Sequence, residues 1–455
     1  MKSAKDLNST RANPKALPRA IADKAITRVE EDNAYVDIVL SHYLDSEHVD
    51  ERDRAFISEL VRGVIRWKKR LDWIVDQLFT GKKQDMPAPV RRLLWQALYQ
   101  IEFMTVPAFA AVNESIRLAR AQKLHRWTGV MNGILRNYDR RPESIVFPDK
   151  TKDPVAYIAV TESFPEWLVE RWLHQFGFEK TRAFCRANNA IPNLSVRVNQ
   201  LKISVTDFEQ LLTRHHTRFR RSVVPGFYRI DKIEYKKRLQ FIDDGLMTVQ
   251  DESAGLVGLL AAPKSGQVVA DLCAAPGGKS THLAELMHNQ GIVLSGDVNK
   301  RRINLVRHAA QRLDLTSVFP VLADAQHFPA QTCDLVLLDA PCSGFGVMRK
   351  KPDLRWKKTP DDLTTLHDLQ KMLIRCAAEL VASHGVLVYS TCTIDPQENE
   401  DIVSDFCKHS DFIVSREEHK FLSNFITENG YIRTWPHVHH MDGSFAVKMI
   451  KRNRT

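Results

Sequence analysis

The sequence predicts a multidomain protein: an all-α N-terminal domain, a small α/β subdomain, and a C-terminal α/β domain with a Rossmann-like, doubly wound parallel sheet. Three observations support this. The chain has 455 residues, more than the roughly 250 to 300 at which one hydrophobic core stops growing. Apolar residues recur at helical spacing up to about residue 141. From residue 265 onward, short apolar runs alternate with helical segments.

Residues 1–18 are polar and contain two prolines, so we expect a disordered tail. The helical domain is expected over 19–145. One face of its longest helical segment, 54–79, is apolar. The residues on that face are Leu60, Val64, Trp67, Leu71, Ile74 and Leu78. Further helical patterns predict five to seven helices in this domain, and they lie at 91–103, 109–122 and 129–138.

Residues 146–248 are expected to form a linker and a small α/β RNA-binding subdomain. Helical patterns occur at 165–177 and 179–189, and the alternation in 194–200 indicates a strand. The segment 214–238 interleaves basic residues with aromatic ones, a mixture that suits phosphate neutralisation and base stacking. A solvated face of an ordinary subdomain would show the same mixture.

The charge of the chain is unevenly distributed. Residues 1–250 carry 42 Lys and Arg against 31 Asp and Glu, whereas 251–455 carry 23 against 24. A polyanionic partner that binds the first half would explain this, as would a solubilising surface. No apolar run approaches the roughly 20 residues of a membrane span, and the seven cysteines lack zinc-site spacing. We therefore expect a cytoplasmic protein with no membrane association and no metal.

The C-terminal domain is expected over 249–455. Five apolar runs in it read as buried strands, and several of them end in Asp, Cys or Thr. The runs are 267–272, 292–297, 318–324, 334–340 and 385–391. Ligands of such sheets bind at the carboxyl ends of the strands.

The loop after the first of these strands reads 273-CAAPGGK-279. A Walker A phosphate loop would need glycine where Cys273 stands, and the three-glycine dinucleotide fingerprint is also missing. A turn of small residues before a helix lets the backbone approach a ligand and favours a carboxylate at the helix N-terminus. S-adenosylmethionine fits this pattern. The loop residues expected to bind it are Cys273, Ala274, Ala275, Pro276, Gly277, Gly278 and Lys279.

Three aspartates end the following strands. Asp297 lies 20 residues after Gly277, the distance at which an acid reaches a ribose hydroxyl in nucleotide-binding folds. Asp324 is placed to contact the adenine amine, and Asp339 lies where a substrate would meet the cofactor. Each alone could be a helix cap or a turn residue.

Two cysteines follow strands at the same edge, Cys342 in 339-DAPCSGFG-346 and Cys392 in 389-YSTCTIDPQENE-400. Carbon 5 of cytosine is too weak a nucleophile to accept a methyl group directly. Attack of a thiolate on carbon 6 produces an enamine that can accept it. This chemistry needs a nucleophilic thiolate, a group that hydrogen-bonds the ring nitrogen, and a base. Asp339 fits the second role, and the residues alone do not decide which cysteine attacks.

These motifs resemble the Sun/NOL1/NOP2 family of RNA cytosine-5 methyltransferases, in family order over about 200 residues. The matching segments are 250–257, 271–285, 297–303, 324–325, 334–356 and 388–400. The helical N-terminus and 164-FPEWLVERW-172 resemble the bacterial Sun/Fmu branch, in which a NusB-like RNA-binding domain precedes the methyltransferase. This resemblance implies a class I methyltransferase domain, S-adenosylmethionine as cofactor, and 16S rRNA, free or in an early assembly intermediate, as substrate.

The resemblance also assigns roles to residues. It implies that Cys392 is the nucleophile and that Cys342 serves product release, and it places Arg302 in support of the cofactor site. Lys279 is then a charge beside the cofactor and the catalytic edge. Near the C-terminus the chain departs from the family, since 442-DGSF-445 stands where members often have Asp-Gly-Phe-Phe. This departure puts the packing of the last strand in doubt.

Two other functions fit the same motifs. A tRNA cytosine-5 methyltransferase would use identical catalytic residues. A catalytically inactive RNA-binding ribosome-assembly factor would keep the NusB-like domain, although the complete set of strand-end cysteines and aspartates argues against it. We expect the enzyme to be a monomer, whether its substrate is rRNA or tRNA.

Overall fold

The computed structural model describes residues 17–46, 49–416 and 422–452. The tail expected over 1–18 lies outside these ranges, except for Leu17 and Pro18, which begin the first helix. The described residues form two compact units. The first unit runs to Asn189 and also contains Lys351–Lys357, and the second contains Ala190–Lys350 and the residues from Lys358 onward. The domain boundaries given above stay a prediction.

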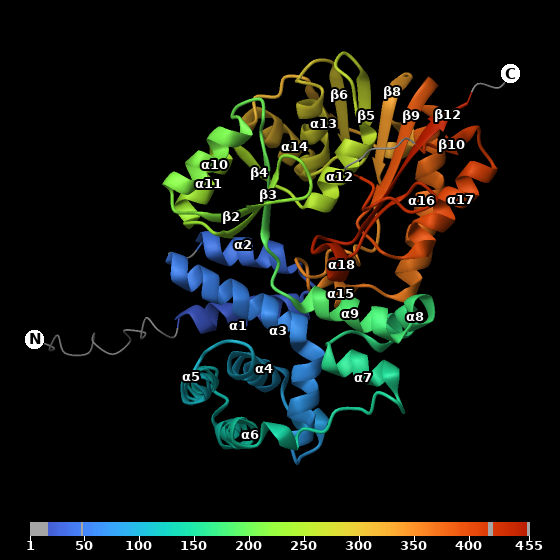
Figure 1. Ribbon diagram of the computed structural model, residues 1–455. Coiled ribbons are helices and arrows are strands. Elements are labelled where there is room, and N and C mark those ends of the chain that lie inside the picture. The colour runs from blue at the N-terminus through green and yellow to red at the C-terminus, as the bar shows by residue number, and fades with distance from the viewer. Residues whose placement is uncertain (1–16, 47–48, 417–421, 453–455) are drawn as a thin grey trace, which may run out of the picture. The chain divides into compact units, whose positions relative to one another are not determined.

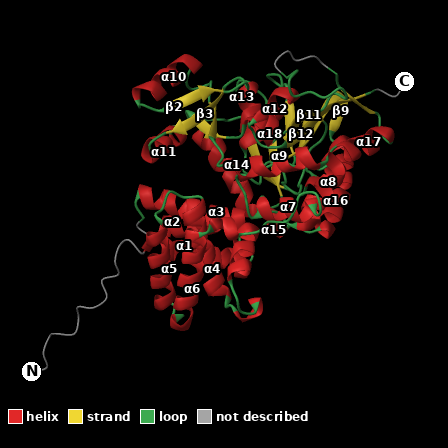
Figure 2. Ribbon diagram, turned by 60° about the horizontal axis from the view of Figure 1, so that its bottom comes forward, coloured by secondary structure: helices red, strands yellow, loops and turns green. Residues whose placement is uncertain are grey.

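The first unit contains helices and loops but no strand among its described residues (Figure 2). Its helices are α1 (Leu17–Glu31), α2 (Val36–Ser46), α3 (Glu51–Leu78), α4 (Ala88–Glu102), α5 (Ala108–Ala121), α6 (Thr128–Arg140), α7 (Pro154–Thr161), α8 (Glu166–Phe176), α9 (Phe178–Asn189) and α15 (Leu354–Lys357). The six described helices α1–α6 confirm the predicted all-α N-terminal domain.

Helix α3 forms the centre of this unit. The Asp50 side chain caps it by accepting a hydrogen bond from the Asp53 N–H at 2.8 Å. The apolar face predicted from spacing points into the core: Leu60, Val64, Leu71 and Ile74 are buried, and Trp67 and Leu78 pack against them as partly buried residues.

The segment Lys351–Lys357 belongs to this helical unit although it follows a predicted catalytic motif in the sequence. The Arg355 guanidinium is fully buried and donates to the carbonyl oxygens of Arg66 at 3.2 Å and Ser163 at 3.0 Å. It also donates to Asn189 Oδ1 at 2.9 Å and lies 3.9 Å from the centre of the Phe164 ring. Burial lowers the pKa of Arg355 to about 9. The segment therefore completes the core of the helical unit.

The second unit begins with a small antiparallel sheet of strand order β2-β3-β1-β4. Its elements in chain order are β1 (Leu194–Val198), α10 (Val205–Arg214), β2 (Arg218–Arg221), β3 (Phe227–Lys232), α11 (Tyr235–Asp243) and β4 (Met247–Val249). This β-α-β-β-α-β order is the ferredoxin-like arrangement. Val196 and Val198 of β1 are buried in the core of this sheet and its helices. The small α/β subdomain is thus confirmed.

The larger sheet has the strand order β10-β12-β9-β8-β5-β6-β7, with β11 paired to β12 (Figure 1). The strands are β5 (Val268–Asp271), β6 (Ile292–Asp297), β7 (Val318–Leu322), β8 (Cys333–Asp339), β9 (Val381–Thr391), β10 (Phe412–Val414), β11 (Ile432–Thr434) and β12 (Ser444–Lys451). β5 to β9 are parallel, as predicted from the five apolar runs. β10, β11 and β12 pair antiparallel, so the sheet is mixed rather than wholly parallel.

Helices cover both faces of this sheet. They are α12 (Glu252–Ala261), α13 (Gly278–Leu286), α14 (Lys300–Arg312), α16 (Pro360–Glu379) and α17 (Glu400–Lys408), and the short α18 (Pro436–His439) precedes β12. Alternate strand residues face opposite cores: Val269 packs with residues of α12 to α14, and Ala270 packs with residues of α16 and α17. This places the carboxyl ends of the parallel strands at one edge, where their loops meet.

The departure at Ser444 is accommodated in the last strand. The Ser444 hydroxyl lies 2.9 Å from the Thr434 hydroxyl on β11, and the neighbouring Phe445 is fully buried. A polar residue therefore fits this position because a hydrogen-bonding partner stands opposite it.

Candidate active site

The loop Cys273–Lys279 makes a tight turn between β5 and α13. The Ala274 N–H donates to the Gly296 carbonyl at 2.7 Å, and the Gly277 N–H donates to the Ala274 carbonyl at 2.7 Å. Gly277 has φ +104°, and a Cβ there would lie 3.1 Å from the Val306 Cα. Glycine is therefore required, both for the backbone angle and for the close approach of α14. Burial raises the pKa of the Cys273 thiol, so this cysteine is a neutral lining group.

Asp297, at the end of β6, lies beside this loop. Its carboxylate accepts a hydrogen bond from the Asn299 N–H at 2.9 Å and lies 3.3 Å from Arg302 NH1. Arg302 also donates to the Ala275 carbonyl at 2.8 Å. The structure thus brings together the predicted Asp297, Arg302 and cofactor loop.

Asp324 follows β7 at the same edge of the sheet and is exposed. Its carboxylate accepts a hydrogen bond from the Gln326 N–H at 2.9 Å, and the residue caps a short 3-10 helix, Ala325–His327. Asp324 therefore has the helix-capping role that the sequence offered as an alternative to ligand binding. A role toward a ligand stays a prediction.

Asp271, at the end of β5, is a polar residue of this edge that the predicted site residues do not include. It is fully buried, and its Oδ2 accepts a hydrogen bond from the Ser280 hydroxyl at 2.6 Å. Within the described residues its Oδ1 has no hydrogen-bond partner. Burial raises the pKa of Asp271 to about 7, and the neighbouring Asp339 adds to the shift. The sequence signal that could have identified Asp271 is its position at the end of a predicted strand.

Lys279 and Asp339 form an ion pair at the centre of the edge. Lys279 Nζ lies 2.7 Å from Asp339 Oδ2, and the Ser390 hydroxyl donates to Asp339 Oδ1 at 2.7 Å. Burial alone would lower the pKa of Lys279, but Asp339, Cys392 and Asp271 together outweigh burial, and the pKa lies above its ordinary value. The site therefore holds a fixed ammonium beside a hydrogen-bonded carboxylate.

The two predicted cysteines meet beside this pair. Cys342 Sγ and Cys392 Sγ are 3.4 Å apart, a hydrogen-bond separation rather than the roughly 2.05 Å of a disulfide. The hydrogen bond to Cys392, together with burial, raises the pKa of Cys342 well above its ordinary value. The Cys342 thiol therefore holds its proton more firmly than an ordinary cysteine does. These two thiols come from loops 50 residues apart in the sequence.

A buried glutamate joins the two cysteine loops. Glu398, 1% exposed, follows the Cys392 loop, and its Oε2 accepts hydrogen bonds from the Ser343 N–H at 2.8 Å and from Gln370 Nε2 at 3.0 Å. Its Oε1 accepts from the Ser343 hydroxyl. Gln370 of α16 also donates to the Pro341 carbonyl at 2.8 Å. Glu398 and Ser343 lie within the quoted motifs, but nothing in their spacing predicted this contact.

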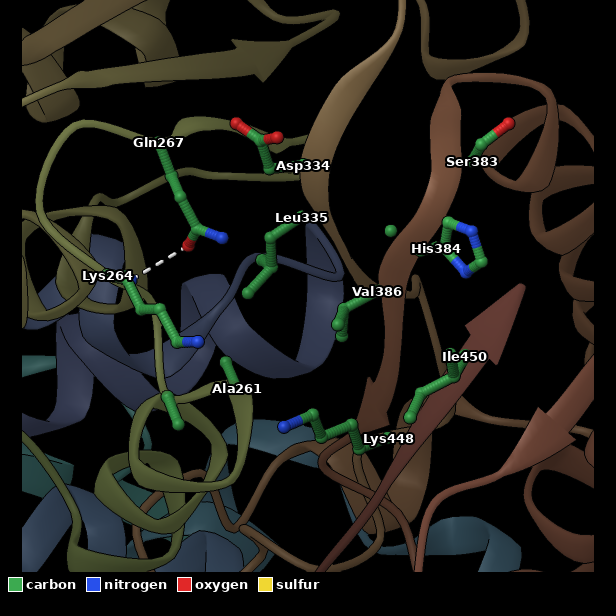
Figure 3. Close-up of a pocket in the computed structure, with 12 residues that line it drawn as sticks. Ala261, Lys264, Gln267, Asp334, Leu335, Ser383, His384, Val386, Lys448 and Ile450 are labelled. Carbon is green, nitrogen blue, oxygen red and sulfur yellow. Dashed lines mark hydrogen bonds between the residues drawn. The ribbon is translucent and has the colours of Figure 1, made fainter. Parts of the chain in front are cut away.

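A separate cavity of about 470 Å³ lies at the opposite edge of the larger sheet (Figure 3). Its lining residues stand at the beginnings of β5, β8 and β9, and they include Lys264, Asp334 and His384. Asp334 accepts a hydrogen bond from the Val268 N–H at 2.8 Å. This cavity is remote from the thiols because each parallel strand runs the length of the sheet between the two edges.

Comparison with known proteins places this chain in a family. The family described as 16S rRNA methyltransferase RsmB/F matches residues 258–450, the NusB family matches 16–140, and an RsmF/B-like ferredoxin-like domain matches 164–226. The probable ribosomal RNA small subunit methyltransferase B of Bacillus subtilis is 36% identical over 451 residues, covering 96% of this chain and 99% of the relative. The chain belongs to this methyltransferase family. The Shigella flexneri member is 30% identical and covers 95% of this chain and 98% of its own.

A solved structure shares the fold of this chain. The crystal structure of the protein PH0851 aligns over 97% of this chain and 99% of its own, with a TM-score of 0.79 and 27% identity. Among the described residues, no helix is long and apolar enough to cross a membrane. The described part of the chain likewise holds no group of three or more His, Cys, Asp or Glu side chains arranged for a metal ion.

Proposed function

We propose that this family member transfers a methyl group from S-adenosylmethionine to carbon 5 of a cytosine in 16S rRNA, through a covalent bond between Cys392 and carbon 6. The observation that carries the proposal is the pair of thiols 3.4 Å apart beside the Lys279–Asp339 ion pair. The names of the relatives, which specify the small ribosomal subunit RNA, support the substrate.

The residues around the cofactor loop fit S-adenosylmethionine. Gly277 offers no capping side chain to α13, so the first N–H groups of this helix are available to the carboxylate of a ligand. The carboxylates of Asp297, Asp324 and Asp339 suit ribose hydroxyls, an adenine amine and an ammonium group. Asp271 Oδ1, buried and without a partner in the described structure, adds a further acceptor behind the loop. When bound, the cofactor supplies an electrophilic methyl group.

The chain's own residues prepare the cytosine for this methyl group. The Cys392 thiolate forms a bond to carbon 6, and the displaced electron pair moves toward ring nitrogen 3. The Lys279 ammonium passes a proton to the Asp339 carboxylate, and the resulting carboxyl group donates a hydrogen bond to nitrogen 3, where negative charge develops. Carbon 5 thereby becomes nucleophilic.

Release of the product needs a base, and Cys342 is in place for it. While Cys392 is a thiolate, its charge keeps the pKa of Cys342 high. Bonding of Cys392 to carbon 6 removes that charge, so Cys342 then loses its proton to water more readily. The Cys342 thiolate takes the proton from carbon 5, the double bond between carbons 5 and 6 forms again, and Cys392 leaves as a thiolate.

The test uses RNA that contains 5-fluorocytosine, which has no removable proton at carbon 5 and therefore traps the covalent bond. We expect the full-length protein to form an adduct with 16S rRNA fragments that survives denaturing electrophoresis, and Cys392→Ala to form none. Cys342→Ala should accumulate an adduct with ordinary RNA. An adduct that persists in Cys392→Ala but disappears in Cys342→Ala would reverse the two roles.

The same assay tests the substrate. Transcripts of 16S rRNA and of tRNA are compared at equal concentration with the wild-type protein and with Cys392→Ala. Methyl transfer to tRNA alone would contradict the proposed substrate and leave the chemistry intact. If 16S rRNA, tRNA and small-subunit particles all fail to accept a methyl group, the proposed activity is contradicted.

A further inference from the structure

Arg197 of β1 reaches out of the small sheet rather than into its core. Its neighbours Val196 and Val198 point into that core, so the alternation along the strand directs Arg197 to the other face. Arg197 is nevertheless only 2% exposed. Residues of the methyltransferase domain therefore surround a charged side chain that the ferredoxin-like domain supplies.

Every hydrogen-bonding nitrogen of this guanidinium has a partner on or beside α13. Arg197 Nε and NH2 each donate to one carboxylate oxygen of Glu285, at 2.9 Å in both cases, which is a bidentate pair. NH1 donates to the Gly278 carbonyl at 2.9 Å and to Gln250, and NH2 donates to the Thr281 hydroxyl at 3.1 Å.

These partners span the whole beginning of α13. Gly278 is the first residue of the helix, Thr281 lies in its first turn, and Glu285 lies one turn further on. Gln250 Nε2 donates to the same Gly278 carbonyl at 3.1 Å, and the Thr281 hydroxyl donates to the Gly277 carbonyl at 2.8 Å. The helix start, which has no capping side chain, is thus held by Arg197 and Gln250 through the Gly278 carbonyl.

We propose that Arg197 is a positioning residue for the cofactor loop: the ferredoxin-like domain holds Gly278 and Lys279 in the geometry that binds S-adenosylmethionine. This inference rests on the proposed function, in which the loop binds that cofactor. Lys279 follows Gly278 directly, so rotation of the Gly278 carbonyl would shift both the Lys279 N–H and the ammonium group that faces Asp339. The small domain therefore contributes to cofactor affinity without touching the cofactor.

Arg229 offers a matched control. It lies on the adjacent strand β3, opposite Ser195, and also crosses from the small sheet to the methyltransferase domain. Its Nε donates to Glu252 Oε1 at 2.6 Å, on α12, and its Nη2 donates to the His439 carbonyl at 3.3 Å, so these hydrogen bonds lead away from α13. Lysine at either position keeps the charge, and at position 197 it cannot form the bidentate pair with Glu285.

The experiment measures S-adenosylmethionine binding to the full chain by calorimetry without RNA, and the KM for the same compound in the methylation assay. For Arg197→Lys we expect the Kd and the KM to rise by about tenfold or more, with kcat changed less than about threefold, since a charge-assisted pair and a carbonyl contact are lost. Arg229→Lys should retain the wild-type Kd.

A second variant covers the case in which Arg197→Lys does not fold. Gln250→Ala removes one hydrogen bond to the Gly278 carbonyl and leaves the buried ion pair in place, so a smaller rise in Kd is expected. A wild-type Kd in Arg197→Lys, or in Gln250→Ala if only that variant folds, would overturn the proposal, as would an equal loss in Arg229→Lys. If the wild-type protein itself does not bind S-adenosylmethionine, the proposed function fails instead.

Discussion

The larger sheet has two edges, one at the carboxyl ends and one at the amino ends of its parallel strands. Both contain charged side chains, but the contacts of these side chains differ between the two edges. The carboxyl edge brings together Lys279, Asp339 and two cysteines, and each side chain there contacts another reactive group. The amino edge also holds charged groups, Lys264, Asp334 and His384, around a cavity. Asp334, however, binds a backbone N–H of β5. This contact of Asp334 thus joins it to the backbone of the sheet, whereas the contact of Lys279 with Asp339 joins one side chain to another.

The largest effect that this comparison predicts is that of Lys279→Ala. Loss of the ammonium leaves Asp339 without its partner and removes positive charge from the place where negative charge develops, so methyl transfer should fall on the order of 100-fold. Steady-state methylation of 16S rRNA measures it. Lys264→Ala at the amino edge is the control and should stay near the wild-type rate. Equal losses in both variants would remove the distinction between the two edges.

Glu398→Gln is expected to have the next largest effect. Glu398 accepts three hydrogen bonds through two oxygens, whereas an amide offers one oxygen and turns a donor toward Ser343 or Gln370. The Cys342 loop should then move away from Cys392, and methyl transfer should fall about tenfold. If Glu398 positions the releasing cysteine, the variant also accumulates covalent RNA adduct. A slow variant with no accumulated adduct would contradict that role.

Asp271→Asn should change the dependence of stability on pH. The folded pKa of Asp271, about 7, lies above the ordinary 3.8, so between these values the folded protein holds a proton that the unfolded chain has released. This contribution to stability is present at low pH and is lost as the pH rises to about 7. Removing the carboxylate should therefore raise the thermal midpoint at pH 8 by a few degrees and change it less at pH 5.

Scanning calorimetry of both proteins at pH 5 and pH 8 gives the comparison. Asp334→Asn, an exposed carboxylate at the amino edge, is the control and should show no such difference between the two pH values. A midpoint that shifts equally at both pH values would show that Asp271 does not titrate in this range.

The smallest effect is expected at the cavity itself. His384→Ala removes an exposed side chain that lines the cavity and stands at the far end of β9 from Cys392. Surface changes of this kind alter stability by less than about 0.5 kcal/mol, and methyl transfer should stay within about twofold of wild type. A tenfold loss of activity would show that the amino edge takes part in the reaction.

The sequence predicted the elements of the site better than their contacts. The five parallel strands follow from apolar runs, and the positions of Asp297, Asp339, Cys342 and Cys392 follow from strand ends that meet at one edge. The strands β10 and β11 were not predicted, because they have three residues each and carry little pattern. A last strand was expected near 442–445, but its antiparallel direction was not.

The features that the sequence did not predict are contacts between segments that lie far apart in the chain. Arg197 binds Glu285 across 88 residues, and Ser343 binds Glu398 across 55. Periodicity reports which face of an element is buried and carries no information about which polar partner lies opposite. A buried Arg or Glu therefore looks in the sequence like any residue of a solvated face.

Arg355 determines how this protein can be divided. The chain passes between its two compact units three times, and the short stretch 351–357 supplies the helical unit with a guanidinium from the catalytic half. Exchange of that half by recombination would leave the carbonyl groups of Arg66 and Ser163 without their donor. The helical unit therefore cannot be separated from residues 351–357 without the loss of these buried hydrogen bonds.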